Sequence, residues 1–444
     1  MTRILTDSGH DSAEPPTLRA RPMRTGPLSM GQLSSLRGYL SWPPECRHEA
    51  NSRRVIALPP DTSVEAIRFS LGELVERHES LRTRYRIPEI GAPSQEVLDA
   101  VPLSMNVQEL PSPEASAAGQ AAMALARSAP FDLRAVTNLR TLVLTHHGQP
   151  RYVCLSAHHI AADGWAHGRL EAELLAHLTT GRFPGPVAPG TPIDLAREQE
   201  SAPWLQRTAD ALEYWKGFVS RQPRLPGPAY GPRLHGWIRL ASTGAVEALA
   251  LECRVFPQAF VLALVTVGIA TIMERDAGVI GLMAANRFDP AHEALVTSMT
   301  GLVPVGFQHG DQTFAEFAEQ MQTATQTAYR HGIRNYDEVA DLGKSAGTEV
   351  PSLDYVFSFF PSRTSLAAAV WHDGEPDFGM SHRTTVPRFY VIASGADVIT
   401  IDVQADPTHF PAPALGRFLR GLQLQGRAVA ADPSISLSEL RRIS

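Results

Sequence analysis

A proline- and glycine-rich break near the middle of the chain constrains its fold more than any other sequence feature. Residues 182–192 contain four prolines and two glycines among few apolar side chains, a composition typical of a linker. At 444 residues the chain also exceeds the usual domain length of about 100–200 residues. We therefore expect an N-terminal lobe over residues 21–182 and a C-terminal lobe over residues 193–444.

Helical and strand patterns occur on both sides of this break. A helix is predicted from Asp61 to about Arg77, with Thr62 and Glu65 as a capping box at its start. A longer apolar stretch predicts a helix over residues 257–275. Short apolar runs that predict strands occupy residues 139–145, 152–157, 279–284, 353–360, 390–394 and 398–405. The predicted fold class is therefore α/β in both lobes, with sheets and helices in an α+β two-layer arrangement.

The composition argues against several classes of partner. A net charge of −6, with basic residues dispersed along the chain, argues against nucleic acid. The three cysteines, Cys46, Cys154 and Cys253, lack the spacing of a disulfide framework or a thiolate metal site. No stretch has the length and apolar content of a signal peptide or a membrane span. We expect a cytoplasmic protein with no metal and no membrane partner, and with residues 1–20 as a disordered tail.

A pair of histidines follows the predicted strand at residues 152–157. Residues 158–164 read HHIAADG, and Leu170 and Leu174 then begin a helical pattern that runs to Gly181. A neutral imidazole is suited to accept a proton near pH 7, because its ordinary pKa lies close to that pH. His159 leaves the end of a strand, which fixes a side chain more firmly than a loop does. We therefore predict that His159 is a general base.

The neighbours of His159 in this segment leave alternatives open. Asp163 could orient the imidazole as in a catalytic triad, or it could hold the turn by pairing with a distant arginine. Gly164 follows at a place where a turn needs backbone freedom. A second pair, His146 and His147, lacks the aspartate and the glycine, and we interpret it as inert surface.

The segment HHIAADG matches the HHxxxDG active-site motif of condensation domains from nonribosomal peptide synthetases, within the chloramphenicol-acetyltransferase-like superfamily. Other segments resemble motifs of that family in the same order along the chain. They are LSMGQ at residues 28–32, RHESLRTRY at 77–85, PFDL at 130–133 and EYWK at 213–216. The likeness extends from residue 26 to the C-terminus, and the chain is identified as similar to a free-standing member of the family.

The resemblance implies a fold and a reaction. Members of the family have two chloramphenicol-acetyltransferase-like lobes in a V-shaped pseudo-dimer, with a central tunnel that would hold His159 at its middle. An acyl or aminoacyl group, carried as a thioester on the phosphopantetheine of a partner carrier protein, would pass to an amine or alcohol acceptor. The acceptor would be a small molecule or a second carrier-bound substrate, and the amide or ester product would belong to natural-product biosynthesis, such as that of an antibiotic. No tightly bound cofactor is implied, and we expect no adenylation or carrier segment within the chain.

The resemblance also assigns roles to residues of the motif. Residues 281–287 are similar to a family strand that ends in an arginine paired with the motif aspartate, which makes Arg287 the expected partner of Asp163. His158 is expected to be a structural partner within the turn. Gly164 is expected to offer a backbone amide near the thioester carbonyl.

Two residues outside these roles each have two interpretations. Trp165 either lines the tunnel or belongs to the core, and core is the commoner place for an aromatic residue at the start of such a helix. Ser358 either faces the tunnel or is a sheet serine whose hydroxyl is satisfied locally. Residues 301–305 and 334–337 depart from the family pattern.

Three related functions are alternatives. The first is an O- or N-acyltransferase of the same superfamily that uses acyl-coenzyme A. The second is an epimerisation relative, which shares HHxxxDG but requires a further acid/base motif that the sequence lacks. The third is an inactive recruitment module that binds a carrier protein; such modules commonly have an altered histidine, whereas His158 and His159 are both retained. The sequence favours the condensation enzyme.

Overall fold

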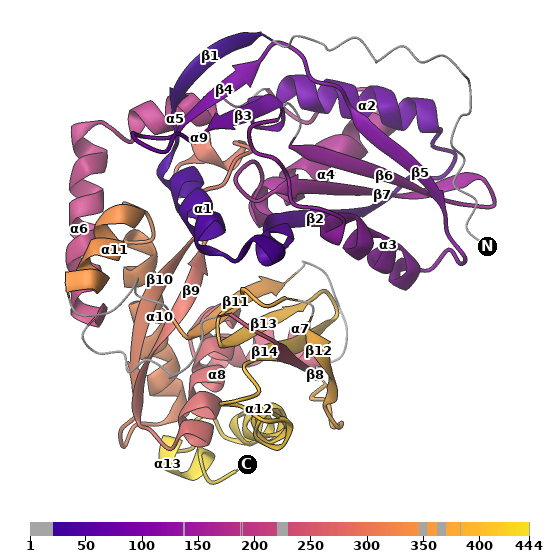
Figure 1. Cartoon of the computed structure of the whole chain (residues 1–444). Coiled ribbons are helices and arrows are strands. Elements are labelled where there is room, and N and C mark those ends of the chain that lie inside the picture. Colours follow the sequence, from indigo (N-terminus) through magenta and orange to yellow (C-terminus); the bar gives the residue numbers. More distant parts are fainter. Residues whose placement is uncertain are drawn as a thin grey trace. The chain divides into compact units, whose positions relative to one another are not determined.

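The chain forms two compact units (Figure 1). The computed structural model describes residues 21–443 except 136–137, 187, 189, 220–229, 346–352, 362–369 and 382. The predicted disordered tail, residues 1–20, lies outside the described residues. The first unit contains Met1–Leu205 and Arg287–Thr300, and the second contains Gln206–Asn286 and Gly301–Ser444.

This division differs from the predicted boundary at residues 182–192. Helix α5 (Pro192–Glu198) follows the proline-rich break but belongs to the first unit, where Asp194 binds Arg24 at 2.5 Å. The segment Arg287–Thr300 also returns to the first unit, because Leu295 and Met299 pack in one apolar cluster with Leu195 of α5. A proline-rich stretch marks irregular backbone, but long-range packing decides to which unit the following residues belong.

The first unit contains a four-stranded sheet of order β2-β7-β6-β5 and a three-stranded sheet of order β1-β4-β3. Its strands are β1 (Pro22–Pro27), β2 (Asn51–Ala57), β3 (Thr83–Arg86), β4 (Ser94–Leu98), β5 (Ser104–Glu109), β6 (Leu139–His146) and β7 (Gln149–His158). Its other helices are α1 (Met30–Ser41), α2 (Val64–Arg77), α3 (Ala115–Arg127), α4 (Gly164–Thr180), α9 (Pro290–Glu293) and the 3₁₀ segments η1 (Pro44–Ala50) and η2 (Glu79–Arg82).

Both faces of the four-stranded sheet are covered by helices. Leu155 of β7 packs with the apolar sides of α2 and α4, whereas the neighbouring Cys154 packs with α3. Figure 1 shows α2 and α3 on opposite sides of this sheet. Because successive side chains of a strand point to opposite faces, a strand covered on both faces is apolar at every position. This explains the continuous apolar run that predicted a buried strand here.

The predicted start of α2 is corrected by the structure. The helix begins at Val64, and Ser63 is its N-cap, with a side chain that accepts from the amide of Ala66. The hydroxyl of Thr62 instead donates to the carbonyl of Pro59 at 2.7 Å, and Asp61 has a φ of 59° outside the helix. The predicted capping box is therefore wrong, because its hydroxyl is already used by the preceding turn.

The second unit is built on a seven-stranded mixed sheet of order β10-β9-β11-β13-β14-β8-β12. Its strands are β8 (Arg233–Ser242), β9 (Ala277–Ala284), β10 (Gly301–Gln308), β11 (Tyr355–Pro361), β12 (Asp377–Ser381), β13 (Phe389–Gly395) and β14 (Val398–Ala405). Its helices are α7 (Thr243–Glu252), α8 (Pro257–Met273), α10 (Phe314–Arg330), α11 (Tyr336–Ser345), α12 (Ala412–Ala431) and α13 (Leu437–Leu440), and α6 (Ala202–Val219) begins in the first unit and continues into the second.

Helix α8 forms the centre of the second unit. Its residues are apolar on all sides and buried from Ala259 to Ala270, as expected for a helix surrounded by other elements. The predicted strands of this half and the helix over residues 257–275 are confirmed, with ends shifted by a few residues. Within the described ranges, no single helix is long and apolar enough to cross a membrane; α7 and α8 together meet that test by length and composition but are bent by 90°.

Candidate active site

The HHIAADG segment connects the end of β7 to the start of α4, as predicted. His158 is the last residue of β7 and pairs with Asn51 of β2. The amide of His159 donates to the carbonyl of Ala50 at 2.8 Å, which continues the pairing one residue beyond the strand. Asp163 is the N-cap of α4 and accepts from the amide of Ala166. A strand end and a helix start therefore fix both ends of the turn.

Asp163 and Arg287 form a bidentate ion pair that is fully buried. The Nη1 of Arg287 lies 2.9 Å from Oδ2 of Asp163, and its Nη2 lies 3.0 Å from Oδ1. The amides of Met299 and Thr300 donate to the same Oδ2 at 2.9 and 3.1 Å. The predicted partnership of these two residues is thus present. With the amide of Ala166, five donors occupy the carboxylate, which favours the alternative in which Asp163 holds the turn.

The charge of Asp163 is stabilised despite its burial. Burial by itself would raise the pKa of this carboxyl group. The attraction and hydrogen bonds of Arg287, with the amides of Ala166 and Met299, outweigh burial and hold the pKa of Asp163 below its ordinary value. The aspartate is therefore ionised at neutral pH and serves as a charged anchor for the segment Arg287–Thr300.

His158 is confined within the protein. Its side chain is buried, and the ring of Tyr39 lies edge-on to it with centroids 4.8 Å apart. The amide of Ile160 donates to its Nδ1 at 3.1 Å, so the ring proton is on Nε2. Burial, and then the charge of nearby His159, lower the pKa of His158 to about 3. His158 is therefore a neutral, fixed ring.

His159 has a different environment. Its side chain is half-buried at the first position of the turn, beyond the last residue of β7. Its Nδ1 lies 3.5 Å from the hydroxyl of Ser298, at the outer limit of a hydrogen bond. Ser298 directly precedes Met299 and Thr300, whose amides bind Asp163. The anchored segment therefore also brings a hydroxyl group beside His159.

Gly164 and Trp165 begin α4, and the structure corrects the interpretation of both. Gly164 is the first helical residue and has no positive φ, so the predicted need for backbone freedom is wrong. A methyl group added at Gly164 would meet no protein atom within 4 Å. Trp165 is 46% exposed, which rules out the core interpretation. Its Nε1 donates to the carbonyl of Glu293 at 2.9 Å, and Arg287 lies 5.8 Å from its ring centroid.

Ser358 lies in strand β11 of the second unit. It is buried, and its hydroxyl shares a hydrogen bond of 3.0 Å with the hydroxyl of Tyr390 on the neighbouring strand β13. This partner accounts for Ser358 as a satisfied sheet serine, the second of its two predicted interpretations.

The RHESLRTRY segment contacts both the HHIAADG turn and helix α4. The side chain of Glu173 in α4 is buried. Its Oε2 lies 2.6 Å from the Nε2 of His78 and 3.2 Å from the Nε of Arg77. The hydroxyl of Ser80 donates to the carbonyl of Ala161 within the HHIAADG turn. The segment therefore links the end of α2 to α4 and to the turn, which is a structural task.

The LSMGQ segment packs against the anchored segment. Ser29 and Gln32 form a capping box at the start of α1. A methyl group added at Gly31 would lie 2.2 Å from the carbonyl oxygen of Ser298 and 2.7 Å from the Cα of Met299. Only glycine therefore allows α1 to approach the backbone that carries Ser298.

Sequence reasoning missed two residues beside the motif, Ser52 and His167. Ser52 lies in β2, and its hydroxyl lies 2.8 Å from the Nε2 of His167, which is in the first turns of α4. His167 is buried. The available signal was weak: a third histidine, eight positions after His159 in a helix.

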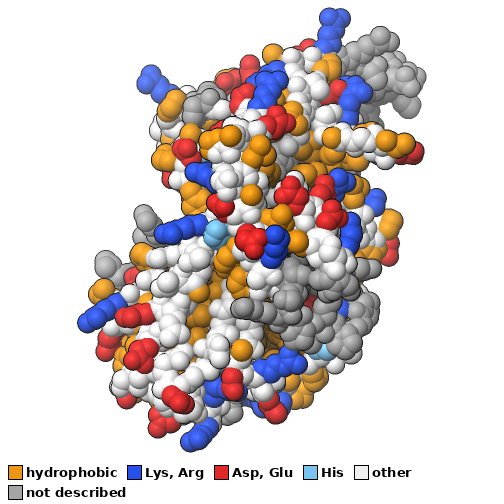
Figure 2. All heavy atoms as spheres, turned by 90° about the vertical axis from the view of Figure 1, so that its left-hand side faces the viewer, with side chains coloured by type: hydrophobic (Ala, Val, Ile, Leu, Met, Phe, Trp, Pro, Cys, Tyr) orange, Lys and Arg blue, Asp and Glu red, His pale blue; other side chains and the backbone are white. Residues whose placement is uncertain are grey.

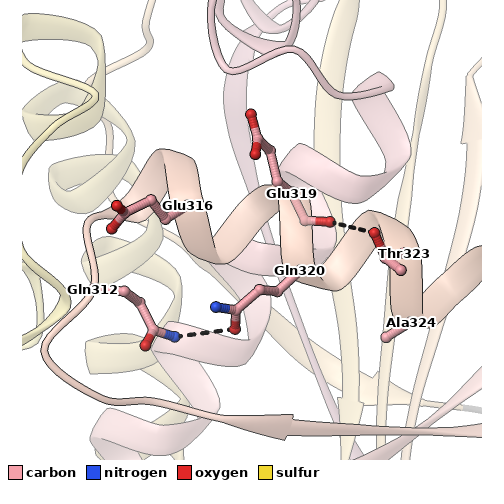
Figure 3. A pocket seen from close by; sticks show the side chains of 6 residues that line it. All are labelled: Gln312, Glu316, Glu319, Gln320, Thr323 and Ala324. Carbon is pink, nitrogen blue, oxygen red and sulfur yellow. Dashed lines mark hydrogen bonds between the residues drawn. The ribbon is translucent and has the colours of Figure 1, made fainter.

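Other candidate sites carry less chemistry. Over the described ranges, no group of three or more His, Cys, Asp or Glu residues could hold a metal ion. Figure 2 shows acidic and basic side chains interspersed over the visible face, without a patch of one sign. An open depression along α10 (Figure 3) is lined by the six residues Gln312, Glu316, Glu319, Gln320, Thr323 and Ala324. Gln312 bonds to Gln320 at 3.4 Å, and the lining contains neither an imidazole nor a thiol.

Known proteins resemble this chain over most of its length. The family model described as "Condensation domain" matches residues 47–440. Phosphinothricin tripeptide synthetase PhsC of Streptomyces viridochromogenes is 26% identical over 466 aligned residues, which cover 96% of this chain and 41% of the synthetase. The chain thus spans about two fifths of the length of that relative.

Solved condensation domains share the fold. The condensation domain from the monacolin K polyketide synthase MokA matches with a TM-score of 0.75 at 18% identity, over 94% of this chain and 99% of that one. A structure described as the molecular basis for condensation domain-mediated chain release from the enacyloxin polyketide synthase matches with a TM-score of 0.74 at 16% identity, over 94% and 85%. The family match over residues 47–440 shows that the chain belongs to the condensation domain family.

Proposed function

We propose that this chain transfers an acyl or aminoacyl group from a carrier-protein thioester to an amine or alcohol, with His159 as its general base. The contrast between the two motif histidines carries the proposal. His158 is buried, neutral and engaged through Nδ1, whereas His159 is half-buried at the end of a strand. Of the pair, His159 therefore combines a fixed backbone with access for a substrate.

The proposed reaction needs only the thioester and the acceptor as reactants. The nitrogen or oxygen of the acceptor attacks the thioester carbonyl, the new C–N or C–O bond forms, and the C–S bond breaks. The proton of the acceptor passes to His159 and then to the departing thiolate of the phosphopantetheine arm. Holding two reactants in attack geometry can contribute roughly 7–11 kcal/mol, and general base catalysis adds about 10²–10⁴-fold.

We assign the developing negative charge of the thioester oxygen to the start of α4. The first amides of a helix point out of its N-terminus, where they favour negative charge. The amide of Ala166 is already bound by Asp163, and Gly164 is exposed with open space above its Cα. The amide of Gly164 is therefore the proposed donor, and the exposed Trp165 beside it is proposed to line the substrate path.

The proposed donor is a phosphopantetheine thioester on a separate carrier protein. The matched proteins are named as peptide and polyketide synthases, and this chain spans 41% of the length of phosphinothricin tripeptide synthetase PhsC. In this proposal the chain acts as a free-standing enzyme in the cytoplasm. Its acceptor is a small amine or alcohol, or a second carrier-bound substrate.

The proposal is tested with His159→Ala and a phosphopantetheinylated carrier protein loaded with an acyl or aminoacyl group. Intact-protein mass spectrometry follows loss of the acyl group from the carrier in the presence of amine or alcohol acceptors. We expect the native chain to accelerate this loss and His159→Ala to abolish the acceleration while retaining the native melting temperature. Parallel reactions with acyl-coenzyme A test the superfamily alternative.

A matched control is His147→Asn, which alters the exposed histidine of the second pair. Asparagine tolerates the left-handed backbone that His147 adopts, with a φ of 52°. This variant is expected to keep full activity. Undiminished turnover by His159→Ala would contradict the role of His159, and transfer from acyl-coenzyme A without transfer from the carrier would contradict the proposed donor.

A further inference from the structure

The hydroxyl of Ser52 connects both ends of the turn that carries His159. It lies 2.8 Å from the carbonyl of Ala157, the residue before the histidine pair. It also lies 3.0 Å from the carbonyl of Ala162, the residue before Asp163. Ser52 is two residues from Ala50, whose carbonyl accepts from the amide of His159. The beginning of β2 thus contacts the turn at its start and at its end.

His167 completes this contact. The Ser52 hydroxyl has one proton, and it faces two carbonyl groups that only accept. The arrangement that satisfies most of these contacts has the hydroxyl oxygen accept from the Nε2 of His167 at 2.8 Å, with the ring proton of His167 on Nε2. The amide of His167 in turn donates to the carbonyl of Asp163 at 2.9 Å. The ring of His167 is oriented by these contacts and holds the hydroxyl of Ser52 toward the two carbonyls.

His167 remains a neutral donor under ordinary conditions. Its side chain is buried, and its Nδ1 has no hydrogen-bond partner among the described residues. Burial, and then the charge of His159, lower the pKa of His167 to about 4, against the opposite influence of Asp163. A second proton on this ring would enter a buried position without an acceptor, so His167 does not compete with His159 as the base.

We propose that Ser52 and His167 are positioning residues that fix the imidazole of His159 for catalysis. This inference rests on the proposed role of His159 as general base. The pair acts through the backbone of the turn, because its contacts are with the carbonyl groups on either side of residues 158–161. A displacement of a reacting group by about 1 Å can reduce a rate by about 10²-fold, so a small shift of this turn has a measurable effect.

The chain contains a matched control pair on the same helix. His177 of α4 lies 2.9 Å through its Nδ1 from the hydroxyl of Ser70 in α2, and both residues are buried. His177 follows His167 by ten residues, which is about 15 Å along a helix. Loss of either serine–histidine bond should therefore have a similar cost in stability, whereas only the Ser52–His167 bond adjoins the motif.

The test compares kcat, KM for the acyl carrier protein and melting temperature in four variants. They are Ser52→Ala, His167→Leu, Ser70→Ala and His177→Leu. We expect kcat to fall by about 10–100-fold for the first two, with KM changed less than threefold. The control variants should keep the native kcat, although their melting temperatures fall by a similar amount. Two conservative variants serve as rescues. Ser52→Thr retains the hydroxyl and His167→Gln retains an N–H donor, and we expect each to have most of the native kcat.

Two results would overturn the inference. One is a native kcat in folded Ser52→Ala and His167→Leu. The other is a loss of kcat in all four variants that follows their melting temperatures, which would indicate a general effect of stability. His159→Ala is measured in the same series, because undiminished activity in that variant contradicts the proposed role of His159 itself and is distinguishable from a failure confined to Ser52 and His167.

Discussion

The carboxylate of Asp163 and the guanidinium of Arg287 are 124 residues apart in sequence and meet in a fully buried bidentate pair. Asp163 caps the helix that follows the histidine motif, and Arg287 begins the segment that carries Ser298 to His159. The pair therefore holds together the two pieces of backbone from which the candidate active site is built.

Breaking this pair should strongly destabilise the first unit. Asp163→Asn retains an acceptor for the helix cap but leaves Arg287 buried without its counter-charge, and we expect a loss of about 3–5 kcal/mol in the free energy of unfolding. Arg287→Met should have a similar cost. Denaturant titration measures both, with Glu213→Gln of the exposed pair with Lys216 as a control expected to lose less than about 1 kcal/mol. Unchanged midpoints in both single variants would contradict the prediction.

The protein should lose stability when the pH falls below about 6.5. The folded state lowers the pKa of His158 to about 3 and that of His167 to about 4, from an ordinary value of 6.5. Between those values the unfolded chain binds protons that the folded chain does not, so the free energy of unfolding decreases as the pH decreases. The contribution of Asp163, whose folded pKa is also lowered, is lost at still lower pH, as the pH falls below the ordinary value of 3.8.

Denaturant titrations at pH 8, 6.5, 5 and 4 check this dependence. We expect little change between pH 8 and 6.5 and a decline from pH 6.5 to 4, on the order of several kcal/mol if both rings stay neutral. His147→Asn should leave the curve unchanged because that ring is exposed. A constant free energy of unfolding between pH 6.5 and 4 is the result that this prediction does not allow.

Replacement of Gly164 by alanine should raise the stability of the protein and lower its activity. The backbone there is helical and a methyl group would meet no protein atom, so Gly164→Ala should stabilise α4 by about 0.5–1 kcal/mol. The same methyl group would enter the space from which we propose that the thioester approaches, and we expect kcat to fall. Gly168→Ala is the control, since it lies in the same helix with equally open space and should stabilise the protein without loss of activity. Equal activities of the two variants would exclude the proposed role of Gly164.

His309 offers a test of buried polarity in the second unit. Its ring is buried against Phe317 and Phe307, and neither ring nitrogen has a hydrogen-bond partner among the described residues. A buried polar group without a partner costs about 1–3 kcal/mol, so His309→Phe should raise the free energy of unfolding by about 1–2 kcal/mol. Thermal and denaturant unfolding measure the change, and a loss of stability would indicate that the ring has a role in packing that phenylalanine cannot fill.

Local patterns carried much of the fold. The continuous apolar run of β7, the all-apolar helix α8 and the motif between a strand and a helix were predictable because each depends on residues close together in sequence. The start of α2 was not predictable, because the hydroxyl of Thr62 donates to the carbonyl of Pro59 in a turn that leaves no periodic pattern in the sequence. The interpretation of Trp165 as a core residue was wrong for a related reason, because the exposure of a helical residue depends on which other elements cover the helix.

The sequence by itself determined the family, the position of the histidine motif and, through the likeness to that family, the pairing of Asp163 with Arg287. Only the tertiary structure decided that the segment Arg287–Thr300 returns to the first unit, that His158 is buried while His159 is half-buried, and that Ser52 and His167 adjoin the turn. The physical reason is that burial and hydrogen-bond partners come from residues far apart in sequence, which a local pattern does not record.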